Sequence, residues 1–207
     1  MNLLHKHPAT RRKGFSLVEV TVAMSIFSVI GYGLFAAVET SNGSQRAVSS
    51  AVAKNETMRS MKSIMADELK LAADDNITVV TLSDNNHQVT FMHPIQLAGS
   101  LGWGVFDPSL GPTEAEQNLP NWQVRYTVDS VVQSGNVNRR LVRQVLDDSG
   151  AIQNTDVLIE GLKGGGAIPP GFSVTRAGDM WEVQVTLIGT TNGGHGGGVS
   201  FHVKTRN

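Results

Sequence analysis

The residue of this chain that points most clearly to chemistry is a carboxylate inside an apolar run. Glu19 is the only charged residue between Phe15 and Val38. A carboxylate within a membrane-spanning helix costs roughly 2.5 to 3.5 kcal/mol on insertion scales, and such residues are usually functional. We therefore interpret Glu19 as a candidate functional residue rather than an incidental charge.

Residues that commonly support catalysis are sparse in the rest of the chain. Cysteine is absent, and no Gly-x-Ser-x-Gly nucleophile motif occurs. The histidines His93, His195 and His202 lack the spacing of a zinc site. His195 lies in a polyglycine run that is typical of a flexible linker and lacks the lysine of a phosphate-binding loop. The sequence therefore predicts no enzyme, no catalytic residue and no cofactor.

One irregular segment carries acidic residues that could be considered for calcium. Asp107, Glu114 and Glu116 fall in it, but they lack the dense alternating carboxylates of an EF-hand loop. Solvated loop acids are the favoured interpretation, with calcium binding as the alternative. We expect no metal site.

The run from Phe15 to Val38 is long enough to cross a membrane. As a helix, its 24 residues span ~36 Å, against about 30 Å for the hydrocarbon core. Upstream lie four cations and no acid, namely Lys6, Arg11, Arg12 and Lys13. Because basic flanks stay in the cytoplasm, the part of the chain after Val38 is expected outside it.

Two simpler kinds of membrane anchor share part of this pattern. The apolar core of a cleaved secretory signal is usually only ~7 to 15 residues long, and it ends at a small-x-small site. The run here is longer, and its glycine, Gly14, comes before the apolar stretch. A plain signal anchor fits the length, but it does not explain Glu19.

The stretch Lys13-Gly14-Phe15-Ser16-Leu17-Val18-Glu19-Val20 resembles the class III signal of type IV pilins and type II secretion pseudopilins. The resemblance implies that a prepilin peptidase cleaves between Gly14 and Phe15 on the cytoplasmic face and N-methylates Phe15. It also implies that Glu19 pairs with the terminal amine of a neighbouring subunit during assembly. The implied partners are the peptidase, other pilins or pseudopilins, the inner membrane and its assembly platform.

Elementary chemistry fits each role that the resemblance implies. Glycine at position 14 lets the backbone lie close to a peptidase. Cleavage would place a positive amine on Phe15, beside the unpaired N–H groups of a helix start. Glu19 is favoured at that end of the helix by the macrodipole, and it offers a counter-charge where unpaired charge is costly.

Removing the leader would also change the charge balance. The remaining chain carries 13 basic side chains against 18 acidic ones, a formal net charge of −5. This balance gives no support to a broad nucleic-acid surface, so a nucleic-acid partner is not expected. A DNA-uptake role would need Arg139, Arg140 and Arg143 to converge, whereas a strand divides neighbouring residues between its two faces.

The helix is predicted to continue beyond the membrane segment to Ala73. An amphipathic stripe at spacings of mostly three or four comprises Val48, Val52, Met58, Met61, Met65, Leu69 and Ala72. The stripe weakens at Asn42-Gly43-Ser44 and at Asn55, where we expect a bend or partial unwinding. A coiled-coil stalk is the alternative, but no strict heptad is sustained.

Short strands separated by turns are predicted after the helix, so the expected class is α+β, with the helix laid on an antiparallel sheet. Trp181, Val183, Val185 and Leu187 alternate and are expected to face the core. The predicted strands are 77–82, 88–92, 123–128, 141–146, 157–160, 172–175, 181–188 and 199–204. The turns Ser83 to His87 and Asp147 to Gly150 separate strands of hairpins.

The predicted organisation is a cleaved leader (1–14), a transmembrane or filament-core helix (15–38), its amphipathic continuation (39–73) and one periplasmic β-rich domain (74–207). The stretches Gly161 to Gly171 and Gly189 to Gly198 are expected as flexible loops, and Gly99 to Pro120 as a long insertion between strands. Without cysteine, stability must come from packing. Trp103, among glycines, is the candidate for partner contact.

The second half of the chain carries a weaker resemblance. The order VRYTV, RRLVRQVLDDSGA, VLIEGLKG, WEVQVTL and VKTRN resembles minor pseudopilins of the J type and W-type minor pilins. The chain departs from them by inserting 164–170 and by the loop around Trp103, while Glu19 argues against the K-type tip pseudopilin. The resemblance implies a minor structural subunit that acts at the filament tip or in initiation. The alternative is a signal-anchored periplasmic enzyme or binding module.

Overall fold

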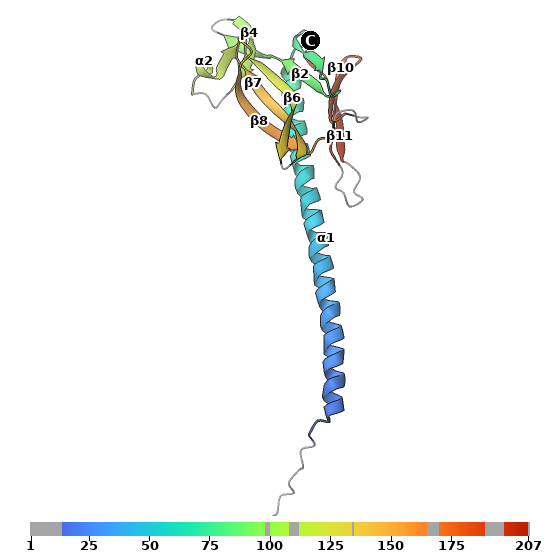
Figure 1. The fold of residues 1–207 in the computed structure, drawn as a ribbon. Coiled ribbons are helices and arrows are strands. Elements are labelled where there is room, and N and C mark those ends of the chain that lie inside the picture. Colours follow the sequence, from blue (N-terminus) through green and yellow to red (C-terminus); the bar gives the residue numbers. More distant parts are fainter. Residues whose placement is uncertain are drawn as a thin grey trace, which may run out of the picture. The chain divides into compact units, whose positions relative to one another are not determined.

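The computed structural model describes residues 14–97, 100–107, 112–133, 135–164, 170–188 and 197–206. The chain divides into two units, Met1–Ala53 and Lys54–Asn207. A long helix, α1, runs from Leu17 to Leu71, and the strands follow it (Figure 1). The predicted α+β class is confirmed, with an N-terminal helix packed on antiparallel sheets.

The helix is continuous at the positions where a bend or unwinding was expected. Asn42, Gly43, Ser44 and Asn55 are all helical. Proline is absent from the whole of α1, so no backbone N–H of the helix is lost to a ring.

The described residues of the second unit form three antiparallel sheets, whose strands can be followed in Figure 1. The largest has the order β1-β2-β6-β7-β8, comprising Thr78–Thr81, His87–Phe91, Gln123–Gln133, Asn136–Leu146 and Ile152–Glu160. A second has the order β11-β10-β9, comprising Gly198–Val203, Met180–Thr186 and Phe172–Ala177. The third has the order β3-β4-β5, comprising His93–Leu97, Ser100–Phe106 and Asn118–Pro120. The short helices are η1 (Asp74–Asn76) and α2 (Glu114–Gln117).

The end of α1 and the first two sheets share one hydrophobic core. Met61, Met65 and Leu69 come from one face of the helix and are fully buried. Burying each contributes about 1.5 to 3 kcal/mol. The predicted face of β10 is confirmed, since Trp181, Val183, Val185 and Leu187 are all buried. Other members of the core are Val89, Phe91, Val124, Tyr126, Leu141, Phe172, Val174, Phe201 and Val203.

The predicted amphipathic stripe is confirmed only in its second half. Met61, Met65, Leu69 and Ala72 are buried, and Met58 packs against the core. Val48 and Val52, by contrast, are 63% and 50% exposed. The sheet therefore uses only the end of the stripe.

All eight predicted strands are present. The prediction that the segment from Gly99 to Pro120 is an insertion between strands was wrong, because the segment itself contains strands. It contains β4 and β5, which pair with each other, and β4 also pairs with β3. The physical reason lies in Gly104, where a Cβ would overlap the backbone carbonyl of Leu119. Glycine here permits a close approach of two strands, a role that the sequence alone does not separate from a loop.

The two predicted hairpin turns are confirmed. β1 and β2 pair around Asn85, which has a φ of 61°. At the second turn, Asp147 Oδ1 accepts hydrogen bonds from the backbone N–H of Ser149 and of Ala151, each at 2.9 Å. Of the two expected glycine loops, positions 165–169 and 189–196 lie outside the described residues.

Candidate processing and assembly site

The site that the sequence predicts is the start of α1. The helix begins at Leu17, and Glu19 lies in its first turn. The N–H of Val20 donates to the carbonyl of Ser16 at 3.1 Å, so the helical hydrogen bonding starts there. The earlier N–H groups have no helical acceptor, and the positive end of the macrodipole favours a carboxylate beside them.

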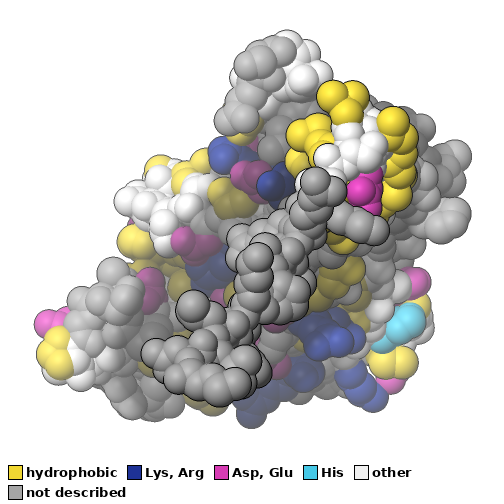
Figure 2. Space-filling model, turned by 90° about the horizontal axis from the view of Figure 1, so that it is seen from below, with side chains coloured by type: hydrophobic (Ala, Val, Ile, Leu, Met, Phe, Trp, Pro, Cys, Tyr) yellow, Lys and Arg dark blue, Asp and Glu magenta, His cyan; other side chains and the backbone are white. Residues whose placement is uncertain are grey.

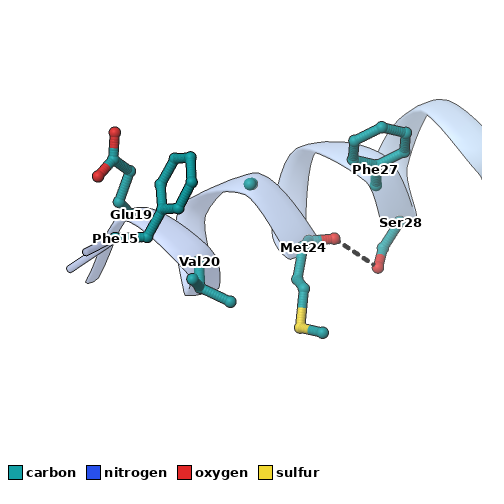
Figure 3. A pocket seen from close by; sticks show the side chains of 7 residues that line it. Phe15, Glu19, Val20, Met24, Phe27 and Ser28 are labelled. Carbon is teal, nitrogen blue, oxygen red and sulfur yellow. Dashed lines mark hydrogen bonds between the residues drawn. The ribbon is translucent and has the colours of Figure 1, made fainter. Parts of the chain in front are cut away.

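Glu19 has no partner within the part of the chain that the structure describes. Its side chain is exposed, and no hydrogen bond or ion pair joins it to any described residue. Figure 3 shows its carboxylate and the ring of Phe15 on the same side of the helix start. Both belong to a groove of about 690 Å³ on this face of the helix, lined by Phe15, Glu19, Val20, Ala23, Met24, Phe27 and Ser28.

Three hydroxyl groups of the apolar run, those of Thr21, Ser25 and Ser28, differ from Glu19 in being satisfied by the helix itself. Thr21 donates to the Val18 carbonyl at 2.9 Å, and Ser25 donates to the Thr21 carbonyl at 2.9 Å. Ser28 donates to the Met24 carbonyl at 2.8 Å, the dashed line in Figure 3. Because these hydroxyls need no water, they add little to the cost of placing the helix in lipid.

The side chains around this end of α1 form an uncovered apolar surface. In Figure 2 hydrophobic side chains, in yellow, surround the end of the helix, with acidic atoms in magenta beside them. Phe15 is 83% exposed and Phe27 is 77% exposed. Among the described residues, α1 is the one helix long and apolar enough to cross a membrane, and none of its most apolar window is buried in the chain. Such a surface needs lipid or other helices to cover it.

The described part of the chain does not require glycine at position 14. A Cβ there would meet no described atom within 4 Å, and the backbone is not in the left-handed region. Any demand for glycine at position 14 must therefore come from another molecule that approaches the backbone.

The residues considered for calcium and catalysis do not form a cluster within the described chain. Glu116 accepts from the hydroxyl of Thr113 at 2.8 Å, next to α2. No group of three or more His, Asp or Glu among the described residues could hold a metal. The side chain of Glu114 and the whole of His195 lie outside the described residues. His93 is buried, and His202 is exposed on β11.

Each of the three arginines considered for DNA binding lies within 4.0 Å of a carboxylate. Arg139 lies 4.0 Å from Asp84, and Arg140 lies 2.6 Å from Asp129. Arg143 points from the sheet to α1, where it lies 2.8 Å from Glu68. These positive charges are compensated within the fold and do not build a basic surface.

The structure adds a partly buried polar network that sequence reasoning missed. Glu68 accepts a hydrogen bond from Arg143 Nε at 2.9 Å and another from the hydroxyl of Tyr126, which is fully buried. Burial and the negative charge of Glu68 raise the pKa of Tyr126 well above its usual value. Burial tends to lower the pKa of Arg143, but its hydrogen bond to Glu68 and the charge of that residue outweigh this effect and raise it. No local pattern marks Glu68, because its partners lie far away in the sequence.

Comparison with known proteins gives one match. The model of the prokaryotic N-terminal methylation motif matches residues 9–32, so the chain carries this motif at the start of α1. The match includes Gly14, Phe15 and Glu19, and it covers none of the globular unit. No curated protein and no solved structure matches the chain.

Proposed function

We propose that this chain is a structural subunit of the pilin or pseudopilin type, cleaved and methylated at its N-terminus and assembled through α1. The observation that carries the proposal is the arrangement at the helix start. An apolar helix that no other described residue covers bears a carboxylate, Glu19, in its first turn, and this carboxylate has no partner among the described residues. Both lie within a matched N-methylation motif. Before assembly, the apolar part of the helix anchors the chain in the inner membrane.

The proposed processing has two steps. A prepilin peptidase hydrolyses the peptide bond between Gly14 and Phe15, which releases the basic leader and leaves an amine on Phe15. An activated methyl donor then transfers its methyl group to that amine; the donor's bond to the methyl group breaks, one N–H proton is released, and the methylated amine keeps its positive charge at neutral pH. The open surroundings of Gly14 support access of a peptidase to the backbone.

Glu19 is the proposed assembly residue. In lipid, a carboxylate without a partner is costly, and a cation on a neighbouring helix removes that cost. The terminal amine of a neighbouring subunit supplies such a cation only after cleavage. Processing and assembly are thereby linked, since an uncleaved chain offers no amine at this position.

The finer assignment rests on the order of the strand motifs. We infer a minor subunit, of the J type in a type II secretion pseudopilus or of the W type in a type IV pilus, which acts at the tip or in initiation. Residues 74–207 would then form the periplasmic domain. Trp103, which is 39% exposed on β4, is the proposed contact for a partner.

Mass spectrometry of the N-terminal peptide, after co-expression with a prepilin peptidase, tests the processing step. The wild type should yield a peptide that begins at methylated Phe15. Gly14→Ala should abolish this peptide, whereas Gly31→Ala is the matched control, because a Cβ at Gly31 also meets no atom within 4 Å. An intact leader in the wild type, or a cut after Ala36 or Ala37, would overturn the assignment.

Incorporation into filaments tests the role of Glu19 separately. Glu19→Gln keeps the size of the side chain but removes its charge, so we expect normal cleavage with strongly reduced assembly. Glu39→Gln changes the next acid along the same helix, beyond the apolar run, and should assemble normally. Equal incorporation of both variants would refute the ion-pair role while leaving the cleavage result intact.

A further inference from the structure

A second site lies in the globular unit, on the face of the five-stranded sheet that points away from the core. Thr78, Thr90 and Arg125 are direct cross-strand neighbours on β1, β2 and β6. They alternate with the buried residues Val89 and Val124, so they lie on the opposite face. A pocket of about 350 Å³ opens over this row, within the size range of small-ligand sites. Its polar lining is Asp75, Asn76, Thr78, Gln88, Thr90, Gln123 and Arg125.

Arg125 is unusual among the arginines of the sheets. Within the described residues, Arg139, Arg140, Arg143 and Arg176 each have a carboxylate within 4.0 Å. Arg125 has no ion pair or hydrogen bond to any described residue, and its Nε is buried without a partner. A partly buried guanidinium that lacks partners is costly and calls for an explanation.

The geometry of the side chain leaves its terminal nitrogens available to a ligand. Among the nitrogens of Arg125, Nε alone is buried without a partner. The two Nη atoms also lack a partner among the described residues, but they are not buried. They are therefore accessible at the pocket that Arg125 lines. Two adjacent nitrogens of a planar guanidinium match the two oxygens of a carboxylate. The amides of Gln88 and Gln123 add donors and acceptors around them.

The charge of the pocket favours a single negative charge. Arg125 is the one cation in its lining, and Asp75 also lines it. A phosphate ester carries a charge of about −1.5 to −2 at neutral pH. The single positive charge of Arg125, with Asp75 in the same lining, does not balance it. A carboxylate brings one charge and is therefore the better match.

The other residues of the pocket indicate whether the carboxylate belongs to a sugar or to a peptide. Phe91 is only 1% exposed, so the pocket presents no aromatic face on which a sugar ring could stack. β1, whose Thr78 and Val80 line the pocket, is an edge strand of the sheet. Its outer backbone groups can pair with an extended peptide.

We propose that this Arg125 pocket binds a carboxylate side chain of a polypeptide partner. The partner's acidic residue forms a two-point contact with Arg125, and its backbone passes over β1 and β2. The pocket lies wholly within the globular unit, so the proposal goes beyond filament assembly and stands whether or not the N-terminal motif is processed.

Binding is tested by NMR titration of the full chain in detergent micelles, observing the backbone N–H signals of β1, β2 and β6 in every variant and the Nε–H signals of the arginine side chains where they are present. The probe is the tripeptide acetyl-Ala-Glu-Ala-amide, with acetyl-Ala-Gln-Ala-amide as its uncharged match. We expect a saturable shift of the Arg125 signal with the glutamate peptide alone. Arg125→Gln should weaken binding at least about tenfold, because it removes a charge-assisted contact. Arg125→Lys should weaken it less, while keeping the charge at the site.

Arg140→Gln is the matched control, since Arg140 lies on the adjacent strand and is already paired with Asp129. It should leave the affinity unchanged. Equal loss in Arg140→Gln would show that binding follows net charge, and this would overturn the site. Stronger Arg125-dependent binding of glucuronate or inorganic phosphate would overturn the peptide assignment. The proposal is also refuted if the glutamate peptide causes no shift that depends on Arg125. The Arg125→Lys chain must be folded for this comparison to count.

Discussion

Replacing Glu68 with alanine should destabilise the globular unit more than any single change of a surface charge. Glu68 and Arg143 are 18% and 17% exposed at the side chain, so solvent screens their interaction weakly. The substitution removes the acceptor of the buried Tyr126 hydroxyl and leaves Arg143 with only Asp156, 3.4 Å away. The link between α1 and the sheet would then contain uncompensated polar groups.

The magnitude follows from those contacts. Breaking a fully buried pair by removing one partner costs about 3 to 5 kcal/mol, and this range already includes the charge left unpaired. The Glu68–Arg143 pair is partly buried, so the expected cost lies toward the lower end of this range. Asp156 lies opposite the same arginine but is 51% exposed, so Asp156→Ala should cost no more than about 1 kcal/mol. The expected difference between the two variants is therefore several kcal/mol.

Urea unfolding of the full chain in detergent, followed by tryptophan fluorescence, measures this difference. Trp103, Trp122 and Trp181 all lie in the second unit, so the signal reports its unfolding. A double-mutant cycle with Tyr126→Phe isolates the hydroxyl contact, and we expect a coupling of about 0.5 to 3 kcal/mol. The reasoning is refuted if Glu68→Ala costs no more than Asp156→Ala.

Two further predictions concern His93 and Gly104. Burial lowers the pKa of His93 below its usual 6.5, against the opposing charge of Glu68, so below pH 6.5 the unfolded chain binds the proton more readily than the folded one. The free energy of unfolding should therefore fall as the pH drops from 6.5, by up to about 1.4 kcal/mol per pH unit. The fall should be less steep in His93→Gln. Unfolding midpoints at pH 7.5 and 5.5 measure both. Gly104→Ala should cost about 1 to 3 kcal/mol or more in the same assay, because its Cβ overlaps the Leu119 carbonyl. Gly102→Ala is its control, since the nearest atom there is the flexible end of a leucine side chain, and an equal cost for both variants would contradict the argument.

Much of the fold could be predicted because its signals are local. Hydrophobic spacing of three and four residues marked the helix, and alternation marked strands such as β10. The turn at Asp147 was recognisable because its carboxylate satisfies backbone N–H groups only two and four residues away. Each of these signals lies within a few residues of the structure it specifies.

The missed elements depend on contacts between distant residues. β4 contains Gly102 and Gly104, and glycine weakens the sequence signal of a strand. The need for glycine at position 104 becomes clear only in the structure, where the backbone carbonyl of Leu119 on β5 lies against it. Likewise, Asp74 in η1 accepts a hydrogen bond from Trp181 Nε1 at 2.7 Å and forms an ion pair with Arg176. These contacts connect the segment that follows α1 to the β11-β10-β9 sheet. No short window of sequence contains both partners of these contacts.

The candidate sites divide along the same line. Gly14, Phe15 and Glu19 lie in a linear motif that the sequence alone reveals, and their roles in processing and assembly stay predictions. The Arg125 pocket could not, since Thr78, Thr90 and Arg125 become neighbours only through strand pairing. An arginine in the sequence also gives no sign of whether a carboxylate will lie opposite it.

Two glutamates on the same helix show what an unpaired charge implies here. Glu68 lies where α1 covers the sheet, and the chain itself supplies its partners, Arg143 and Tyr126. Glu19 lies where the helix is apolar and uncovered, and no described residue of the chain meets it. Since a lone carboxylate in lipid is costly, we propose that its partner comes from another molecule. A cation created at Phe15 by cleavage is well suited to that role, because it would make the pairing available only to processed subunits.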